Sequence, residues 1–211
     1  MHIPKLYREE DRAKILEFIR QNDFAVLVTH DGEKPVASHL LMEVLEEGDT
    51  LYVNGHMSRA NSQWKTFEIN PEILVIFHGP HTYISPIWYN HVNVPTWNYQ
   101  SVHVYGKPRI ITEYDEVYDV LRRLVNRYET GSHYNMETLP QDFVEKEIKG
   151  IVAFQIEVTR VEANYKLSQN RKDEDHANII TRLEEERTDD LSHRVAEAMR
   201  QQRPGRNKIT P

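Results

Sequence analysis

Cysteine is absent from this chain of 211 residues, and its absence removes several chemistries together. Without a thiol there is no disulfide, no cysteine-ligated zinc and no thiol nucleophile. No apolar run approaches the roughly 20 residues that a membrane-spanning helix needs. The opening residues, MHIPKLYR, also lack the apolar core of a secretory signal. The sequence therefore predicts no membrane span and a cytoplasmic location.

Motifs for nucleotide binding and for hydrolase chemistry are missing as well. The chain has no G-x-G-x-x-G loop, no P-loop and no G-x-S-x-G elbow. It has 11 histidines, but none pair four residues apart around a carboxylate on an expected helix. We therefore predict neither a metal site nor catalytic residues. The net charge of −7 argues against a generally basic surface for nucleic acid.

Apolar alternation and turn residues predict an antiparallel meander rather than β-α-β units. Asp31-Gly32 separates two apolar runs and is a strong signal of a hairpin turn. Gly55 is expected to end one strand, and Gly79-Pro80 another. The expected strands cover residues 24–30, 35–44, 51–54, 72–78, 82–85, 101–111 and 151–158, the last with an extension to 161.

Helical spacing of apolar residues predicts helices around this sheet, so the expected fold class is mainly β with peripheral helices (α+β). The clearest helix covers residues 113–129, behind a Thr112–Asp115 segment that resembles a capping box. Others are expected at 10–21, 58–70 and 140–148, and two more follow residue 172, the second capped by Thr188.

The segment from Leu51 to Trp64 is the strongest candidate for an anion site. A strand would deliver Gly-His-Met-Ser-Arg onto a helix that Ser58 caps. Free amides, the positive end of the helix dipole and the Arg59 guanidinium would then converge on one phosphate. The alternative is a capped surface helix with a solvated arginine.

The segment from Trp88 to Tyr99 has too few aliphatic residues for a core strand and too many aromatic residues for an idle loop. We interpret it as a loop that covers a pocket or a subunit interface. An aromatic-rich loop would otherwise leave a large apolar patch in water.

Six segments, taken in order, resemble the PaiB family of FMN-binding negative transcriptional regulators. The resemblance covers the chain from the first expected helix to about residue 185. The sequence departs from the family pattern at Leu41, where the family commonly has proline. It implies a split β-barrel of the pyridoxamine-phosphate-oxidase type over residues 1–165, a helical extension over 166–211, bound FMN and a homodimer. The segments are Ala37–Leu40, Gly55–Trp64, Ile76–Tyr89, Val94–Tyr99, Val102–Gly106 and Lys166–Arg171.

FMN needs donors for its phosphate, polar groups along the ring edge and apolar or aromatic cover. Ser58 and Arg59 suit the phosphate, and Ser38 to Leu40 suit the ring edge. The aromatic residues either cover the ring, from the same or the partner subunit, or serve dimer packing alone. The predicted cofactor-binding residues are Ser38, His39, Leu40, His56, Ser58, Arg59, Asn61, Trp64, His81, Tyr83, Trp97 and Tyr99.

By this resemblance the chain is expected to act as a negative regulator of protease production and sporulation genes. The alternatives are an FMN-dependent oxidoreductase and a haem-binding split barrel, each with only an indirect regulatory effect. Five cations between Arg194 and Lys208 form the one obvious basic cluster, which would carry phosphate contacts if the protein binds DNA. Alternatively, these cations simply suit the negative end of a helix dipole.

Overall fold

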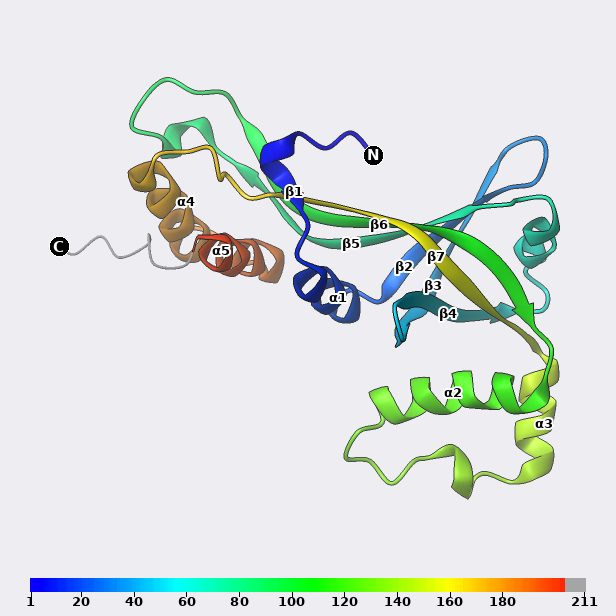
Figure 1. The fold of residues 1–211 in the computed structure, drawn as a ribbon. Coiled ribbons are helices and arrows are strands. Elements are labelled where there is room, and N and C mark those ends of the chain that lie inside the picture. Colours follow the sequence, from blue (N-terminus) through cyan, green and yellow to red (C-terminus); the bar gives the residue numbers. More distant parts are fainter. Residues whose placement is uncertain (204–211) are drawn as a thin grey trace. The chain divides into compact units, whose positions relative to one another are not determined.

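The structure, a computed structural model, describes residues 1–203. Its strands and helices are shown in Figure 1. The helices are α1 (Arg12–Gln21), α2 (Tyr114–Tyr128), α3 (Gln141–Lys149), α4 (Asp173–Glu185) and α5 (Asp190–Gln202), with short 3-10 helices η1 (Lys5–Tyr7), η2 (Ser62–Glu68), η3 (Pro86–Trp88) and η4 (Met136–Thr138). The strands are β1 (Arg8–Glu9), β2 (Phe24–His30), β3 (Pro35–Glu47), β4 (Thr50–Ser58), β5 (Ile73–Ile84), β6 (Thr96–Ile111) and β7 (Ile151–Lys166).

The strands form one sheet in the order β1-β7-β4-β3-β2-β5-β6, and β6 also pairs with β7. This last pairing closes the sheet into a barrel, and the strand registers are antiparallel. The prediction of a mainly β fold with peripheral helices is therefore confirmed. In the described part of the chain, no helix is long and apolar enough to cross a membrane.

The chain forms two compact units. The first unit comprises Met1–Ile15, His78–Val102 and the chain from Glu162 onward. The second unit comprises Leu16–Phe77 and His103–Val161. Strands β5, β6 and β7 each continue from one unit into the other, so each unit contains one part of each of these strands.

A glycine allows close packing inside the second unit. Gly55 pairs with Met42 on one side and Phe154 on the other. A Cβ atom at Gly55 would lie 2.7 Å from Phe154 Cζ and 2.8 Å from Met42 Sδ. The prediction that Gly55 ends a strand is therefore wrong, because the glycine makes room for a ring and β4 continues through it to Ser58.

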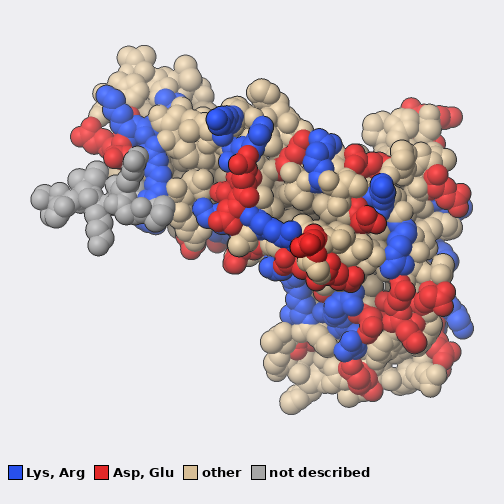
Figure 2. Space-filling model, viewed as in Figure 1, with Lys and Arg blue, Asp and Glu red and all other residues tan. Residues whose placement is uncertain are grey.

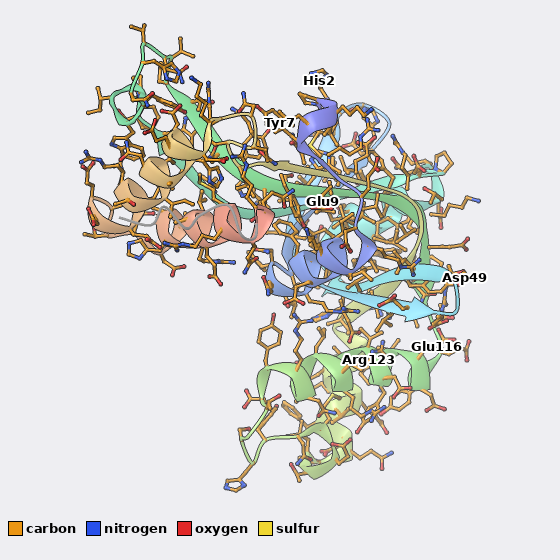
Figure 3. The ribbon with its side chains drawn as sticks, turned by 60° about the vertical axis from the view of Figure 1, so that its left-hand side comes forward. His2, Tyr7, Glu9, Asp49, Glu116 and Arg123 are labelled. Atoms are coloured by element: carbon orange, nitrogen blue, oxygen red, sulfur yellow. The ribbon has the colours of Figure 1, made fainter. Side chains whose placement is uncertain are left out.

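Helix α2 covers one face of the sheet in the second unit, and the prediction of a helix over 113–129 is confirmed. Its buried Val117, Val120 and Leu124 pack with Ile111 and Ala153. Arg123 and Glu116 both project from α2 (Figure 3). The Nε atom of Arg123 donates to Glu43 Oε2 at 2.7 Å, which adds a polar tie between α2 and β3.

Helices α4 and α5 lie side by side in the first unit (Figure 1). They share a core in which Ile179, Leu183, Val195 and Met199 are fully buried. Trp88 joins this unit, because its indole Nε1 donates to Glu186 Oε2 at 3.2 Å and its carbonyl accepts from Asn178 on α4.

Three of the predicted helix caps are wrong. Thr112 forms no capping box, because α2 begins after Glu113, which makes no side-chain cap hydrogen bond. Helix α5 is capped by Asp189 rather than Thr188, and the Asp189 carboxylate accepts from Ser192 N at 2.8 Å. The helix expected to begin at Ser58 is instead η2, whose cap is Asn61.

Two strands also differ from the prediction. β5 continues through Gly79-Pro80 to Ile84 as one strand. Its pairing with β2 covers only Leu74–Ile76, so Pro80 removes no donor from that ladder. β6 begins at Thr96, so Trp97 and Tyr99 lie in a strand rather than in a loop.

Candidate functional site

Four of the predicted site residues meet where β3 and β4 approach η2 in the second unit. We call Ser38, Ser58, Arg59, Asn61 and the neighbouring Gln63 the strand-end cluster. Asn61 Nδ2 donates to Ser38 Oγ at 2.8 Å, and Asn61 Oδ1 accepts from Gln63 N at 3.0 Å. One asparagine thus caps η2 and ties it to β3.

Gln63 fixes this cluster to the sheet, and the sequence analysis did not single it out as a site residue. Its side chain is only 1% exposed. Its Nε2 lies 3.1 Å from the Leu27 carbonyl oxygen, 3.2 Å from Thr29 Oγ1 and 3.2 Å from the Val36 carbonyl oxygen. Its Oε1 is buried without a hydrogen-bond partner in the described part of the chain. No sequence pattern distinguishes such a glutamine from a solvated one.

Arg59 binds backbone carbonyls at the junction of α3 and β7. Its Nε donates to Lys149 O at 2.8 Å, its Nη2 donates to Ile151 O at 2.6 Å, and its backbone N donates to Gly150 O at 2.9 Å. Among the described residues, Nη1 has no acceptor, and the side chain is exposed. One edge of the guanidinium is therefore occupied, whereas the other can still donate to an anion.

Ser58 and Trp64, both predicted site residues, lie beside Arg59. Ser58 is exposed, and its Oγ accepts from Ala60 N at 3.3 Å, which leaves the hydroxyl proton available as a donor. Trp64 Nε1 donates to the Arg59 carbonyl oxygen at 3.3 Å. The arrangement offers a cation and a hydroxyl donor at the end of a strand. The predicted helix N-terminus does not contribute, because η2 begins only at Ser62.

Strand alternation separates the remaining residues of β3. Ser38 pairs with Leu27 and Leu40 with Ala25, whereas His39 between them pairs with Val26. Because neighbouring side chains in a strand point to opposite faces, Ser38 and Leu40 share one face and His39 takes the other. His39 is exposed, and its ring stacks on Phe24 with centroids 6.1 Å apart.

His56 lies on the face of β4 that α2 covers. It pairs with Ala153, which belongs to the apolar cluster beneath α2. Its Nδ1 is buried without a hydrogen-bond partner in the described structure. Burial lowers the pKa of His56, because the charged imidazolium would lose its hydration. The ring is therefore neutral at physiological pH.

The other predicted residues lie in the first unit, on β5 and β6. We call His81, Tyr83, Trp97 and Tyr99 the aromatic strip. The Trp97 ring centroid lies 6.1 Å from those of both His81 and Tyr83. Tyr99 Oη accepts from Asn164 Nδ2 at 3.0 Å. Trp97 remains 51% exposed, so the strip presents aromatic surface.

His78 extends this group of rings. Its centroid lies 4.7 Å from that of His81, whose Nδ1 is 3.3 Å from the Gly79 carbonyl oxygen. Burial lowers the pKa of His78, and the neighbouring His81 lowers it further. No group of three or more potential metal ligands occurs in the part of the chain that the structure describes.

The polar segment after β7 has an arrangement that the sequence did not indicate. Ser168 has a φ of 61°, and its Oγ donates to Asn98 Oδ1 at 3.1 Å. Lys166 Nζ donates to Thr96 Oγ1 at 2.5 Å, and burial lowers the pKa of Lys166. Serine rarely adopts a positive φ, so no residue pattern indicates this turn.

The basic C-terminal cluster is largely neutralised within residues 1–203. Arg200 pairs with Glu184, and Arg203 Nη1 lies 3.1 Å from Asp173 Oδ1. Acidic and basic side chains are interspersed over the face in Figure 2. Arg206 and Lys208, also part of the predicted cluster, lie outside the described residues.

Comparison with known proteins reveals the family. A family model described as "Putative FMN-binding domain" matches residues 1–160. The protease synthase and sporulation protein PAI 2 of Bacillus subtilis is 42% identical over 188 residues, which cover 88% of this chain and 90% of that protein.

Solved structures share the fold at low sequence identity. An FAD- and haem-binding protein of Mycobacterium smegmatis matches with a TM-score of 0.58 and 15% identity, covering 81% of this chain and 79% of that one. A conserved hypothetical protein of Mycobacterium tuberculosis matches with the same TM-score and identity, covering 81% and 92% of the two chains. The barrel is thus a split β-barrel of the pyridoxamine-phosphate-oxidase type. With the family model over residues 1–160 and the Bacillus relative over most of both lengths, the chain belongs to the PaiB family, whose barrel is a flavin-binding domain.

Proposed function

We propose that the chain binds FMN at the strand-end cluster and acts as a PaiB-like negative regulator of protease production and sporulation genes. The observation that supports this most directly is Arg59, which is held along one edge of its guanidinium and open along the other. An arginine edge and the neighbouring Ser58 hydroxyl match the oxygens of a phosphate monoester. This donor set favours FMN over riboflavin.

Each residue of the strand-end cluster has a distinct role in this proposal. Arg59 and Ser58 bind the phosphate, and Asn61 orients Ser38 at the ring edge through their 2.8 Å hydrogen bond. Leu40, on the same face as Ser38, contributes apolar contact. When bound, FMN supplies a ring that can accept and release one or two electrons.

The proposed assembly is a homodimer in the cytoplasm, in which the second copy supplies aromatic cover. The loop before β6 exposes Val92 fully and Val94 to a large extent, and Ile87 in η3 and Trp97 at the start of β6, on either side of this loop, are also largely exposed. An apolar group of this kind on a polar chain is typical of a protein interface. The aromatic strip begins at this loop and is proposed to face the flavin of the other copy.

The regulatory part of the proposal draws on the Bacillus relative, whose name refers to protease synthesis and sporulation. DNA contact through the C-terminal segment stays a proposal, in which Arg206 and Lys208 would join the described cations. A flavin oxidoreductase or haem-binding role is the second candidate, because a structural neighbour binds FAD and haem. The absorbance spectrum of the purified protein distinguishes flavin bands from a Soret band.

The test is the flavin affinity of Arg59→Ala, with Arg20→Ala as the matched control. Arg20 is an exposed arginine whose Nη2 lies 2.9 Å from Glu46 Oε1. A charge-assisted phosphate contact contributes roughly 1.5–3 kcal/mol, so Arg59→Ala should weaken FMN binding about tenfold or more. FMN titration followed by quenching of flavin fluorescence measures both variants. Equal affinities in the two variants would show that Arg59 does not hold the phosphate.

A further inference from the structure

We propose that the C-terminal end of α3 positions Arg59 for the flavin phosphate, so that phosphate binding and the order of α3 are coupled. This inference rests on the FMN site proposed above and extends it to a helix outside the strand-end cluster. Three hydrogen bonds make the connection, from Arg59 Nε, Nη2 and N to the carbonyls of Lys149, Ile151 and Gly150.

These three carbonyls lie where α3 ends and β7 begins. The last carbonyls of a helix have no partner within the helix and carry the negative end of its dipole. Arg59 satisfies two such acceptors, because its Nε donates to Lys149 O at 2.8 Å and its backbone N donates to the carbonyl of the C-cap residue Gly150 at 2.9 Å. Its Nη2 donates at 2.6 Å to Ile151 O, the first carbonyl of β7. The guanidinium is also stabilised as a cation there. Arg59, the residue that follows β4, thus caps α3.

The same two bonds limit the freedom of the arginine side chain. A free arginine loses rotamer entropy when it binds an anion, which weakens binding about twofold to tenfold per ordered side chain. Arg59 is already ordered by Lys149 O and Ile151 O, whereas Nη1 has no acceptor among the described residues. The carbonyls of Lys149, at the end of α3, and of Ile151, at the start of β7, therefore hold the guanidinium with one edge open for a phosphate.

Helix α3 depends on such contacts, because it buries little of its own surface. It has nine residues, and Val144 is its buried side chain. Coupling between two binding events is reciprocal. A phosphate that fixes Arg59 must therefore also strengthen the cap and slow the opening of the last turn of α3. If phosphate and the carbonyls instead competed for Arg59, phosphate binding would weaken the cap and speed the opening of the last turn of α3.

The test compares Val144→Ala, which loosens α3, with Val195→Ala, an equal deletion at a fully buried position of α5. Both are assayed where circular dichroism shows them folded. We expect Val144→Ala to weaken FMN binding about twofold to tenfold, the range that follows from the ordering cost of one side chain. Riboflavin, which has no phosphate, should bind both variants equally well.

Hydrogen exchange of the unmodified protein provides a test without any variant. FMN should slow exchange over residues 141–151, and riboflavin should not. If FMN binds but accelerates exchange there, or leaves it unchanged, the coupling is refuted. If Arg59→Ala weakens FMN binding while Val144→Ala does not, the positioning by α3 is refuted and the phosphate site stands. If FMN does not bind the unmodified protein, both proposals fail.

Discussion

Gln63 offers a sharp test of how the strand-end cluster is held in place. Replacing it by methionine keeps the length of the side chain but removes the amide. The two protons on Nε2 serve three acceptors, namely Leu27 O, Thr29 Oγ1 and Val36 O. Each net hydrogen bond contributes about 1 kcal/mol, so their loss costs about 2 kcal/mol. The substitution also removes Gln63 Oε1, a buried acceptor without a partner that destabilises the fold, and this offsets part of the loss.

The expected decrease in the free energy of unfolding for Gln63→Met is therefore about 1–2 kcal/mol. For a chain of this size, that corresponds to a decrease of about 2–8 °C in Tm. Gln63→Glu should lower the free energy of unfolding more than Gln63→Met at pH 8, because an ionised carboxylate would face three acceptors without a donor. Burial raises the pKa of such a carboxyl, so the penalty should shrink as the pH falls and the protonated form regains one donor.

Thermal unfolding followed by circular dichroism at pH 5.5 and pH 8 measures both variants. Gln21→Met is the matched control, because Gln21 is exposed and only donates to Glu17 Oε1 at 2.6 Å. A Gln63→Met variant with the Tm of the unmodified protein at both pH values would refute the reasoning. So would a Gln63→Glu variant whose Tm, relative to that of the unmodified protein at the same pH, rises from pH 5.5 to pH 8.

Two further predictions concern pH and assembly. Burial lowers the pKa of His56 in the folded protein, so the unfolded chain takes up a proton at higher pH, and the free energy of unfolding should fall as the pH drops below about 6.5. In urea unfolding, His56→Gln should lack the part of the pH dependence that His56 causes, whereas the control His78→Gln should keep it. If the free energy of unfolding of His56→Gln depends on pH as that of the unmodified protein does, His56 is not the group responsible. Sedimentation velocity at micromolar concentration should show a dimer that Val94→Asp weakens, because Val94 is 67% exposed in the apolar loop before β6. A monomeric unmodified protein would rule out that interface.

Local signals predicted much of the fold. The Asp31-Gly32 turn and its flanking strands match β2 and β3, and the apolar spacing over 113–129 matches α2. Gly55 shows where such signals fail. From local sequence a glycine predicts the end of a strand, but here the absence of a side chain makes room for Phe154, which is far away in the sequence. Only the pairing of β4 with β7 reveals that role.

The candidate site was predictable in its residue types and less so in its geometry. The sequence indicated an arginine and polar residues beside a strand end, and the structure brings Ser38, Asn61 and Arg59 into that region. It could not indicate that Arg59 would bind carbonyls at the end of α3, since that contact joins residues of distant sequence. It also could not indicate that His56 would lie beneath α2, since that depends on which face the helix covers.

The closure of the barrel by β7 has a consequence for the synthesis of this protein. β4 gains its second neighbouring strand only when β7 has been synthesised, because residues 151–157 pair with residues 52–58. β6 likewise gains its second neighbour only when it pairs with β7. A ribosome that has not reached residue 151 therefore holds a sheet with two open edges, which can pair with other chains. Pairings this distant in sequence also make folding slow. We expect the nascent chain to be most prone to aggregation just before its last strand emerges.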